Sequence, residues 1–399
     1  MNRKNTYILM CKNDEVLSFH VDFRKSKVTF IEKLEHFDKA PHGINGTDKE
    51  INDRLSRFIH TRTIPAERRG YKEILKATHC RNGFSLSFKG HGLSLSNHYW
   101  YKKPGENLRY EDINFFVNTW DDSFARAILR GDYEALSCVD LNVPDIVTAG
   151  WGVKGWIYDE KKGPRLYKMG IHDESPDEAL GEVLASRLAQ RLFKKEEVLQ
   201  YDLEKIEGKY ASVSLPMISV DEELIPLTHY LPFEMYQVYH GYTMDKKAFM
   251  RFLDMLKDGG YSDLYTFFVK LNCLKSLCFV SDLHFGNISV LKNMKTGDIR
   301  VAPLYDLGGS FGSGSTAKKF LANPDKSTLL LAYFIYTNLD PEWDYSWYDK
   351  DRLIGFEDEI RRVLSKSDFY KPDIIDFVVE LYRQQKSSLD EMASRSPKR

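Results

Sequence analysis

Two short polar segments carry residue types at a spacing that suits phosphoryl transfer. The first, 281–287, holds Asp282 five residues before Asn287. The second, 304–308, holds Asp306 two residues before a glycine, which permits a sharp backbone turn. Phosphoryl transfer needs positioned phosphates and metal together with neutralised charge, and little covalent chemistry from the protein. Asp282 is therefore the candidate catalytic base, and the side-chain oxygens of Asn287 and Asp306 are candidate Mg²⁺ ligands.

The spacing within these segments is that of a protein-kinase active site. Asp-x-x-x-x-Asn is the spacing of the kinase catalytic loop, and Asp-Leu-Gly at 306–308 parallels the metal-binding Asp-Phe-Gly of those enzymes. Either segment alone is common in ordinary loops, but here a predicted hairpin over 288–302 joins the two. We expect His284, which lies between Asp282 and Asn287, to brace the loop through hydrogen bonds rather than to act as a base.

A kinase core also needs a strand lysine for the α- and β-phosphates and a helix glutamate that holds this lysine. Lys168 ends the strand-like run 165–168. Glu182 lies in a helix predicted over 177–193, where leucines recur at helical spacing. We therefore expect Lys168 to bind phosphate and Glu182 to pair with it.

A glycine-rich stretch, 150–155, precedes that strand. Gly150 and Gly152 allow the backbone to approach phosphates closely and to offer N–H donors to them. Lys154 either reaches a phosphate or stays in solvent. The stretch alone is weak evidence for phosphate binding, but its position just before the strand of Lys168 strengthens that prediction.

The composition describes a folded protein and disfavours several classes. Of the 399 residues, 42% are hydrophobic and 29% are charged, which is typical of a globular chain. A net charge of −1 gives no overall drive toward nucleic acid, so we expect no direct nucleic-acid binding. Five cysteines without Cys-x-x-Cys spacing argue against a disulfide framework and a structural zinc site. Because apolar runs are short, we expect a soluble cytoplasmic protein without membrane attachment.

The order of these motifs resembles one family, the HipA-type serine/threonine kinases, whose core is similar to those of protein kinases and phosphatidylinositol kinases. The family pattern is a Val-Ala-Gly loop, a strand lysine, a helix glutamate, Asp-x-His-x-x-Asn and Ala-Pro-x-Tyr-Asp. This chain has Thr-Ala-Gly at 148–150, Lys168, Glu182, Asp-Leu-His-Phe-Gly-Asn at 282–287 and Ala-Pro-Leu-Tyr-Asp at 302–306. The resemblance covers about residues 145–320.

This resemblance implies an ATP-dependent kinase that uses Mg²⁺ and transfers phosphate to a serine or threonine of a protein. It implies the same roles for Asp282, Asn287, Asp306, Lys168 and Glu182 as the residues themselves suggest. It also implies an adenine-binding hinge in the backbone around Ser214 to Pro216. The usual setting of the family, a toxin neutralised by an antitoxin partner, is a further implication.

The resemblance also raises the question of autophosphorylation. Some HipA kinases regulate themselves through a serine just before the phosphate-facing loop, where this chain has Val147 followed by Thr148. Thr148 is a candidate site, as are Ser310 and Ser313 in a glycine- and serine-rich segment after Asp306 that also contains Ser315 and Thr316. The same composition suits a mere flexible loop.

We expect an α+β protein with a two-lobed, protein-kinase-like fold. The predicted domains are an N-terminal α+β accessory domain at 1–140, a β-rich kinase N-lobe at 141–220, a mainly helical C-lobe at 221–393 and a frayed tail at 394–399. Residues 1–140 do not resemble the small N-terminal domain of the toxin kinases.

Two other functions remain open on the sequence alone. Asp-x-His-x-x-Asn also resembles the phosphatidylinositol-kinase loop, so the acceptor could be a lipid head group or a small molecule. The chain could instead be a nucleotide-binding regulatory module that transfers phosphate poorly. Labelled ATP with separate protein, lipid and metabolite pools would separate a protein kinase from a lipid or small-molecule kinase. Tight ATP binding without turnover would favour the regulatory module.

Overall fold

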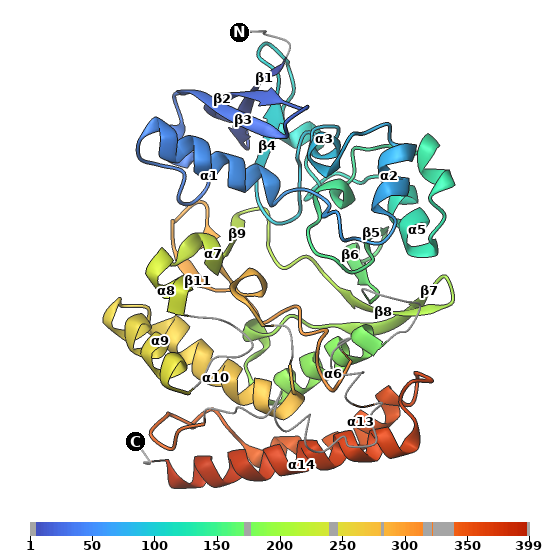
Figure 1. Cartoon of the computed structure of the whole chain (residues 1–399), viewed down its shortest axis with the longest axis vertical. Helices are drawn as coiled ribbons and strands as arrows, with labels where there is room; N and C mark the ends of the chain where they lie inside the picture. The colour runs from blue at the N-terminus through green and yellow to red at the C-terminus, as the bar shows by residue number, and fades with distance from the viewer. Residues whose placement is uncertain are drawn as a thin grey trace. The chain divides into compact units, whose positions relative to one another are not determined.

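The computed structural model describes residues 5–170, 177–238, 246–280, 283–313, 321 and 339–396 (Figure 1). The chain forms two compact units. The first unit comprises Met1–Ile171, Leu215–Ile225 and Lys292–Asp298. The second comprises His172–Ser214, Pro226–Leu291 and Ile299–Arg399.

The first unit is built on a four-stranded antiparallel sheet. Its strands are β1 (Thr6–Cys11), β2 (Asp14–Asp22), β3 (Lys27–Lys33) and β4 (Tyr99–Lys102), in the order β3-β2-β1-β4. β1 pairs with both β2 and β4, so strands far apart in the sequence become neighbours. Alternation of the side chains along β1 sends Leu9 to one face and Met10 to the other.

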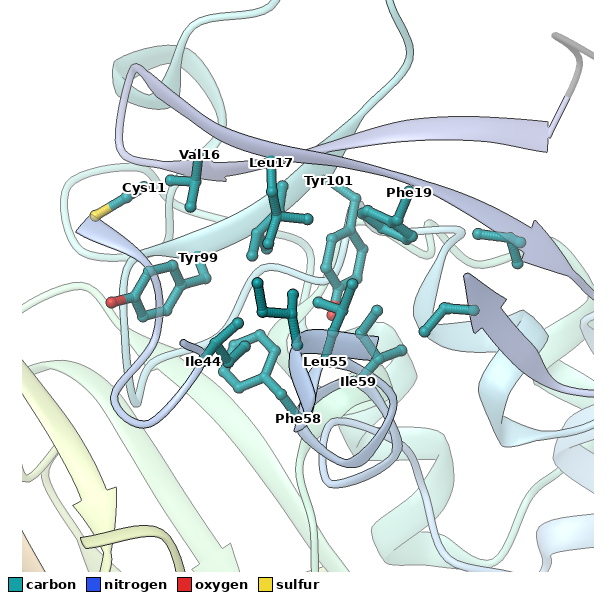
Figure 2. Packing of buried hydrophobic residues seen from close by; sticks show 14 of the residues in the cluster. Cys11, Val16, Leu17, Phe19, Ile44, Leu55, Phe58, Ile59, Tyr99 and Tyr101 are labelled. Atoms are coloured by element: carbon teal, nitrogen blue, oxygen red, sulfur yellow. The ribbon is translucent and has the colours of Figure 1, made fainter. Parts of the chain in front are cut away.

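Helix α1 (Asp48–His60) covers one face of this sheet. It begins with a capping box, in which the Thr47 side chain accepts from the Glu50 N–H and the Glu50 side chain accepts from the Thr47 N–H. Its buried residues recur at the spacing of one helix face: Ile51, Leu55, Phe58 and Ile59. Figure 2 shows Leu55, Phe58 and Ile59 packed with side chains of the strands, among them Leu17, Phe19, Tyr99 and Tyr101.

The other face of the sheet packs against a hairpin that carries candidate site residues. This hairpin consists of β5 (Lys154–Asp159) and β6 (Gly163–Lys168). Trp156 of β5 belongs to the same buried cluster as Met10 and Trp100 of the sheet. The accessory region and the glycine-rich hairpin therefore share one hydrophobic core within the first unit.

Short elements complete the first unit. They are η2 (Phe37–Lys39), α2 (Tyr71–Ala77), α3 (Gly83–Ser87), α4 (Tyr110–Ile113), α5 (Ser123–Arg130), η3 (Glu134–Cys138) and η4 (Pro144–Val147). The strand β9 (Glu222–Pro226) follows the predicted hinge.

The second unit is mainly helical. Its helices are α6 (Asp177–Leu192), α7 (Leu227–Tyr230), α8 (Phe233–Val238), α9 (Lys246–Asp258), α10 (Ser262–Cys278), α13 (Phe356–Leu364) and α14 (Pro372–Arg395), with the 3-10 turns η5 (Lys195–Glu197), η7 (Phe285–Asn287) and η8 (Lys350–Leu353). Its strands are β7 (Asp202–Ile206), β8 (Lys209–Ser214) and β11 (Ile299–Val301), together with the first three residues of β10 (Ser289–Asn293).

Contacts between helices fix the core of this unit. α13 packs on both α6 and α14, and α10 packs on α9 and α14 (Figure 1). Glu359 of α13 accepts from Arg187 and Arg191 of α6, at 3.1 and 2.9 Å. These ion pairs hold α6 on α13.

The predicted α+β class is confirmed, with a sheet-based first part and a mainly helical later part. The compact units follow the packing of the chain and are not contiguous in sequence. The domain boundaries at 140/141 and 220/221, which were drawn from the motifs, stay a prediction. Among the described residues, no helix has the length and apolar character needed to cross a bilayer.

Candidate active site

The β5–β6 hairpin brings two candidate lysines together. In its antiparallel register, Lys154 lies directly opposite Lys168. Directly opposite residues of an antiparallel pair place their side chains on the same face of the sheet. Two lysines on one face of a hairpin concentrate positive charge there, which suits a polyanion such as a triphosphate. The hairpin thus combines the predicted ATP lysine with the lysine of the glycine-rich stretch.

The glycine-rich loop curls over Lys154. Gly150 has φ of +93°, a conformation that side-chain-bearing residues rarely adopt. A Cβ atom placed on Gly150 would collide with Nζ of Lys154, so the ammonium lies against the loop backbone. Gly152 lies between Trp151, which is exposed, and Val153, which is buried. The loop tip is therefore in solvent and its end is anchored.

Glu182 lies in the second unit, on α6. Its side chain is 2% exposed and accepts a hydrogen bond from the Ser212 hydroxyl of β8. Ser214 is buried at the end of β8, and Pro216 follows in the first unit. The pairing of Glu182 with Lys168 and the hinge role of Ser214 and Pro216 stay predictions.

The loop with Asn287 is anchored by its apolar residues. Asp282, the predicted base, lies outside the described residues. Phe285 is buried, and its ring centroid lies 5.5 Å from that of Phe252 and 6.0 Å from that of Phe268. Nδ1 of His284 accepts from the Gly286 N–H at 3.0 Å, and the Asn287 N–H donates to the His284 carbonyl at 2.9 Å. The exposed His284 thus closes a turn within the loop.

Tyr305 ties this loop to the Asp306 segment. Its hydroxyl is 2.7 Å from Ser289 Oγ and donates to the Gly286 carbonyl at 3.3 Å. These two partners flank Asn287 in the sequence, and Tyr305 itself precedes Asp306. The side chain of Tyr305 therefore brings the two predicted metal ligands into one region of the second unit.

The Asp306 backbone is held in an unusual conformation. Its φ is +59°, in the left-handed region that Asp and Asn tolerate better than most residues. The Asp306 N–H donates to the buried Tyr201 hydroxyl at 3.4 Å. Leu304, two residues earlier, forms a parallel bridge with Val198. An uncommon φ that surrounding contacts maintain is typical of functional positions.

Asn287 and Asp306 fit a magnesium ion by their chemistry. Both offer hard oxygen donors, and Mg²⁺ in nucleotide sites is held by few protein oxygens together with water and phosphate. Among the described residues there is no cluster of three or more His, Cys, Asp or Glu that could hold a metal. A Mg²⁺ ion in a nucleotide site would take phosphate oxygens as further ligands.

The candidate autophosphorylation sites differ from the exposed, flexible residues that such a role suggests. Ser310 and Ser313 are 0% and 1% exposed, and the Ser313 hydroxyl donates to the carbonyls of Ser310 and Gly308. Modification of either serine would require residues 308–313 to open. The Thr148 hydroxyl donates to Pro144 at 2.8 Å and accepts from Trp156 Nε1 at 3.2 Å. Ser315 and Thr316 lie outside the described residues.

Segment 308–313 is packed tightly on α6 at Gly181. A Cβ atom placed there would lie 2.6 Å from the Ser310 carbonyl oxygen and 2.9 Å from that of Gly308. Real Cβ atoms do not come this close; the Ser313 hydroxyl also lies in the way, and the two carbonyl oxygens are backbone atoms. Gly181 therefore sets the distance between α6, which carries Glu182, and the segment that follows Asp306.

A Gly181→Ala substitution should consequently impair both stability and activity. Alanine normally stabilises a helix interior by about 0.5–1 kcal/mol relative to glycine. Here the overpacking should reverse the sign and cost about 1–3 kcal/mol. Chemical denaturation would measure the stability and labelled-phosphate transfer the activity. A stabilised variant with unchanged transfer would show that the contact between α6 and 308–313 is loose.

Several residues of this site were absent from the sequence interpretation. Tyr305 is part of the Ala-Pro-x-Tyr-Asp segment but was given no role, and Tyr201 and Ser212 were not singled out at all, because hydroxyl contacts between distant segments leave no local pattern. Gly181 did offer a signal: a glycine inside a strongly helical pattern suggests close packing.

Comparisons with known proteins add a structural likeness. Neither a protein-family model nor a curated protein sequence matches the chain. Among solved structures, the Helicobacter pylori proinflammatory kinase CtkA is similar, with a TM-score of 0.41 and 15% sequence identity. The match covers 61% of this chain and 93% of that chain. A likeness of this size does not assign an activity to this chain.

Proposed function

We propose that this chain is a serine/threonine protein kinase of the HipA type, which transfers the γ-phosphate of Mg-ATP to a protein hydroxyl. The observation that carries the proposal is the tie made by Tyr305. Its hydroxyl contacts Gly286 and Ser289 on either side of Asn287, and its own neighbour is Asp306. Two segments with kinase-type spacing thus converge through the tyrosine of the Ala-Pro-x-Tyr-Asp segment.

The first unit supplies what a triphosphate requires. Lys154 and Lys168 share one face of a hairpin, and the glycine-rich loop lies against the Lys154 ammonium. Two cations and exposed backbone N–H groups suit the negative charge of the phosphates. We assign ATP binding to Lys168, Lys154 and the 150–155 loop on this basis.

The proposed reaction is an in-line displacement at the γ-phosphorus. The acceptor hydroxyl oxygen forms the new P–O bond, the bond to the β–γ bridging oxygen breaks, and ADP leaves. The carboxylate of Asp282 accepts the hydroxyl proton. Lys168 and Lys154 neutralise charge on the phosphates. Mg²⁺, when bound by Asn287 and Asp306, would supply further charge neutralisation on the phosphate oxygens.

The direct test compares wild type with Asp282→Ala in transfer of labelled γ-phosphate from Mg-ATP. Acceptors are the protein itself, a cell lysate, a lipid pool and a metabolite pool. Loss of a general base should lower the rate by about 10² to 10⁴. The exposed Asp254 of α9 offers a matched control, and Asp254→Ala should behave as wild type.

The acceptor pool decides between the candidate functions. Label in serine or threonine of a protein, dependent on Asp282, supports the proposal. Dependent label only in lipid or metabolite would replace it with a lipid or small-molecule kinase. Measurable ATP binding with no label in any pool would make the chain a nucleotide-binding regulatory module.

A further inference from the structure

A buried arginine from the accessory region forms hydrogen bonds with the glycine-rich loop. Arg68 lies just before α2 and is 4% exposed. Its Nε and Nη2 donate to the Gly150 carbonyl at 2.9 and 2.6 Å, and Nη2 also donates to the Thr148 carbonyl at 2.6 Å. The two loop carbonyls are 80 and 82 residues away in the sequence, so this contact exists only in the folded protein.

The burial of this guanidinium is compensated by a buried carboxyl group. Asp145, which is 3% exposed, attracts Arg68 and accepts from the Trp156 N–H at 2.9 Å. Burial raises the pKa of Asp145 to about 7 and lowers the pKa of Arg68 to about 10. Arg68 stays charged at neutral pH, and its rigid fork of donors fits two neighbouring carbonyls where a lysine would meet one.

Holding these carbonyls also fixes the N–H groups of the loop. In a trans peptide the carbonyl and the N–H of the next residue point in opposite directions. The N–H groups of Ala149 and Trp151 therefore point away from the guanidinium. In the described part of the chain neither N–H has a hydrogen-bond partner, and both residues are exposed. Two such donors beside the Lys154 ammonium form an anion-binding surface.

We propose that Arg68 is a positioning residue that holds the glycine-rich loop with its N–H groups turned toward the triphosphate of the nucleotide. This inference rests on the proposed function and extends it by giving the accessory region a role in phosphate binding. The group recognised is the polyphosphate, because exposed N–H donors near an ammonium group attract an anion. The affinity for adenosine, which has no phosphate, should not depend on Arg68.

The experiment measures binding of ATP and of adenosine to wild type and to Arg68→Lys by calorimetry. Lysine keeps the positive charge opposite Asp145 but cannot hold both carbonyls. ATP affinity should fall about tenfold, the equivalent of one hydrogen bond to a charged group, while adenosine affinity stays unchanged. Arg69 is exposed and adjacent, so Arg69→Lys is the matched control and should bind both ligands as wild type does.

A second variant guards against misfolding of the first. Arg68→Met combined with Asp145→Asn removes both buried charges together, which folded proteins often tolerate. It should show the same selective loss for ATP, with a melting temperature near that of wild type.

Each outcome bears on the inference. A loss for ATP alone supports it. Equal losses for ATP and adenosine would make Arg68 a general structural residue, and unchanged ATP affinity would mean that the loop needs no anchor; either result overturns the inference. If wild type binds neither ATP nor adenosine, the proposed function itself is wrong. If wild type binds ATP and Arg68→Lys binds it equally well, only the role of Arg68 is wrong.

Discussion

An Asp306→Asn variant should lose at least about 10³-fold in kcat/KM for γ-phosphate transfer, because removing a metal-binding carboxylate forfeits several kcal/mol of charge stabilisation in the transition state. The variant should remain folded. Asparagine is the informative replacement because Asp306 has φ of +59°, which Asn adopts readily. Alanine would add backbone strain of about 1–2 kcal/mol and confuse the two effects.

Transfer should be measured over a range of Mg²⁺ concentrations, together with the melting temperature. If Asp306 binds the metal, the Mg²⁺ concentration for half-maximal transfer should rise in the variant. Asp254→Asn on the surface of α9 is the control for loss of a carboxylate. If Asp306→Asn transfers phosphate at the wild-type rate, Asp306 is not a metal ligand. This conclusion does not depend on the result for Asp282.

The sequence predicted those features whose causes are local. The leucines of 177–193 recur at helical spacing, and α6 spans Asp177–Leu192. The strand ending at Lys168 and the hairpin after Asn287 likewise follow from short apolar runs separated by turn residues. In each case the signal and the element share the same dozen residues, so no tertiary information is needed.

The remaining parts of the site depend on contacts that composition does not reveal. A glycine- and serine-rich segment was expected to be flexible, yet Ser310 and Ser313 are buried because Gly181 lets α6 approach their backbone. Arg68 lies 82 residues from Gly150, and nothing in the sequence around 68 distinguishes it from the exposed Arg69. Such residues emerge only when the chain's distant segments are placed together.

The lysine pair provides the second large effect. Lys168→Met should lower kcat/KM for ATP by about 10² to 10³, the cost of removing one preorganised positive donor from a transition state that carries spread phosphate charge. Lys162, exposed in the turn of the same hairpin, gives the control variant Lys162→Met, which should keep wild-type kinetics.

Lys154→Met should also weaken use of ATP, because Lys154 lies opposite Lys168 on the same face. Two side chains that bind one polyphosphate act as a unit, so the losses in the double variant should not add. Independent, additive losses would mean that Lys154 and Lys168 serve different groups. If Lys168→Met keeps wild-type kinetics while Asp306→Asn is inactive, the metal-site assignment holds. The assignment of phosphate binding to the β5–β6 hairpin would then be wrong.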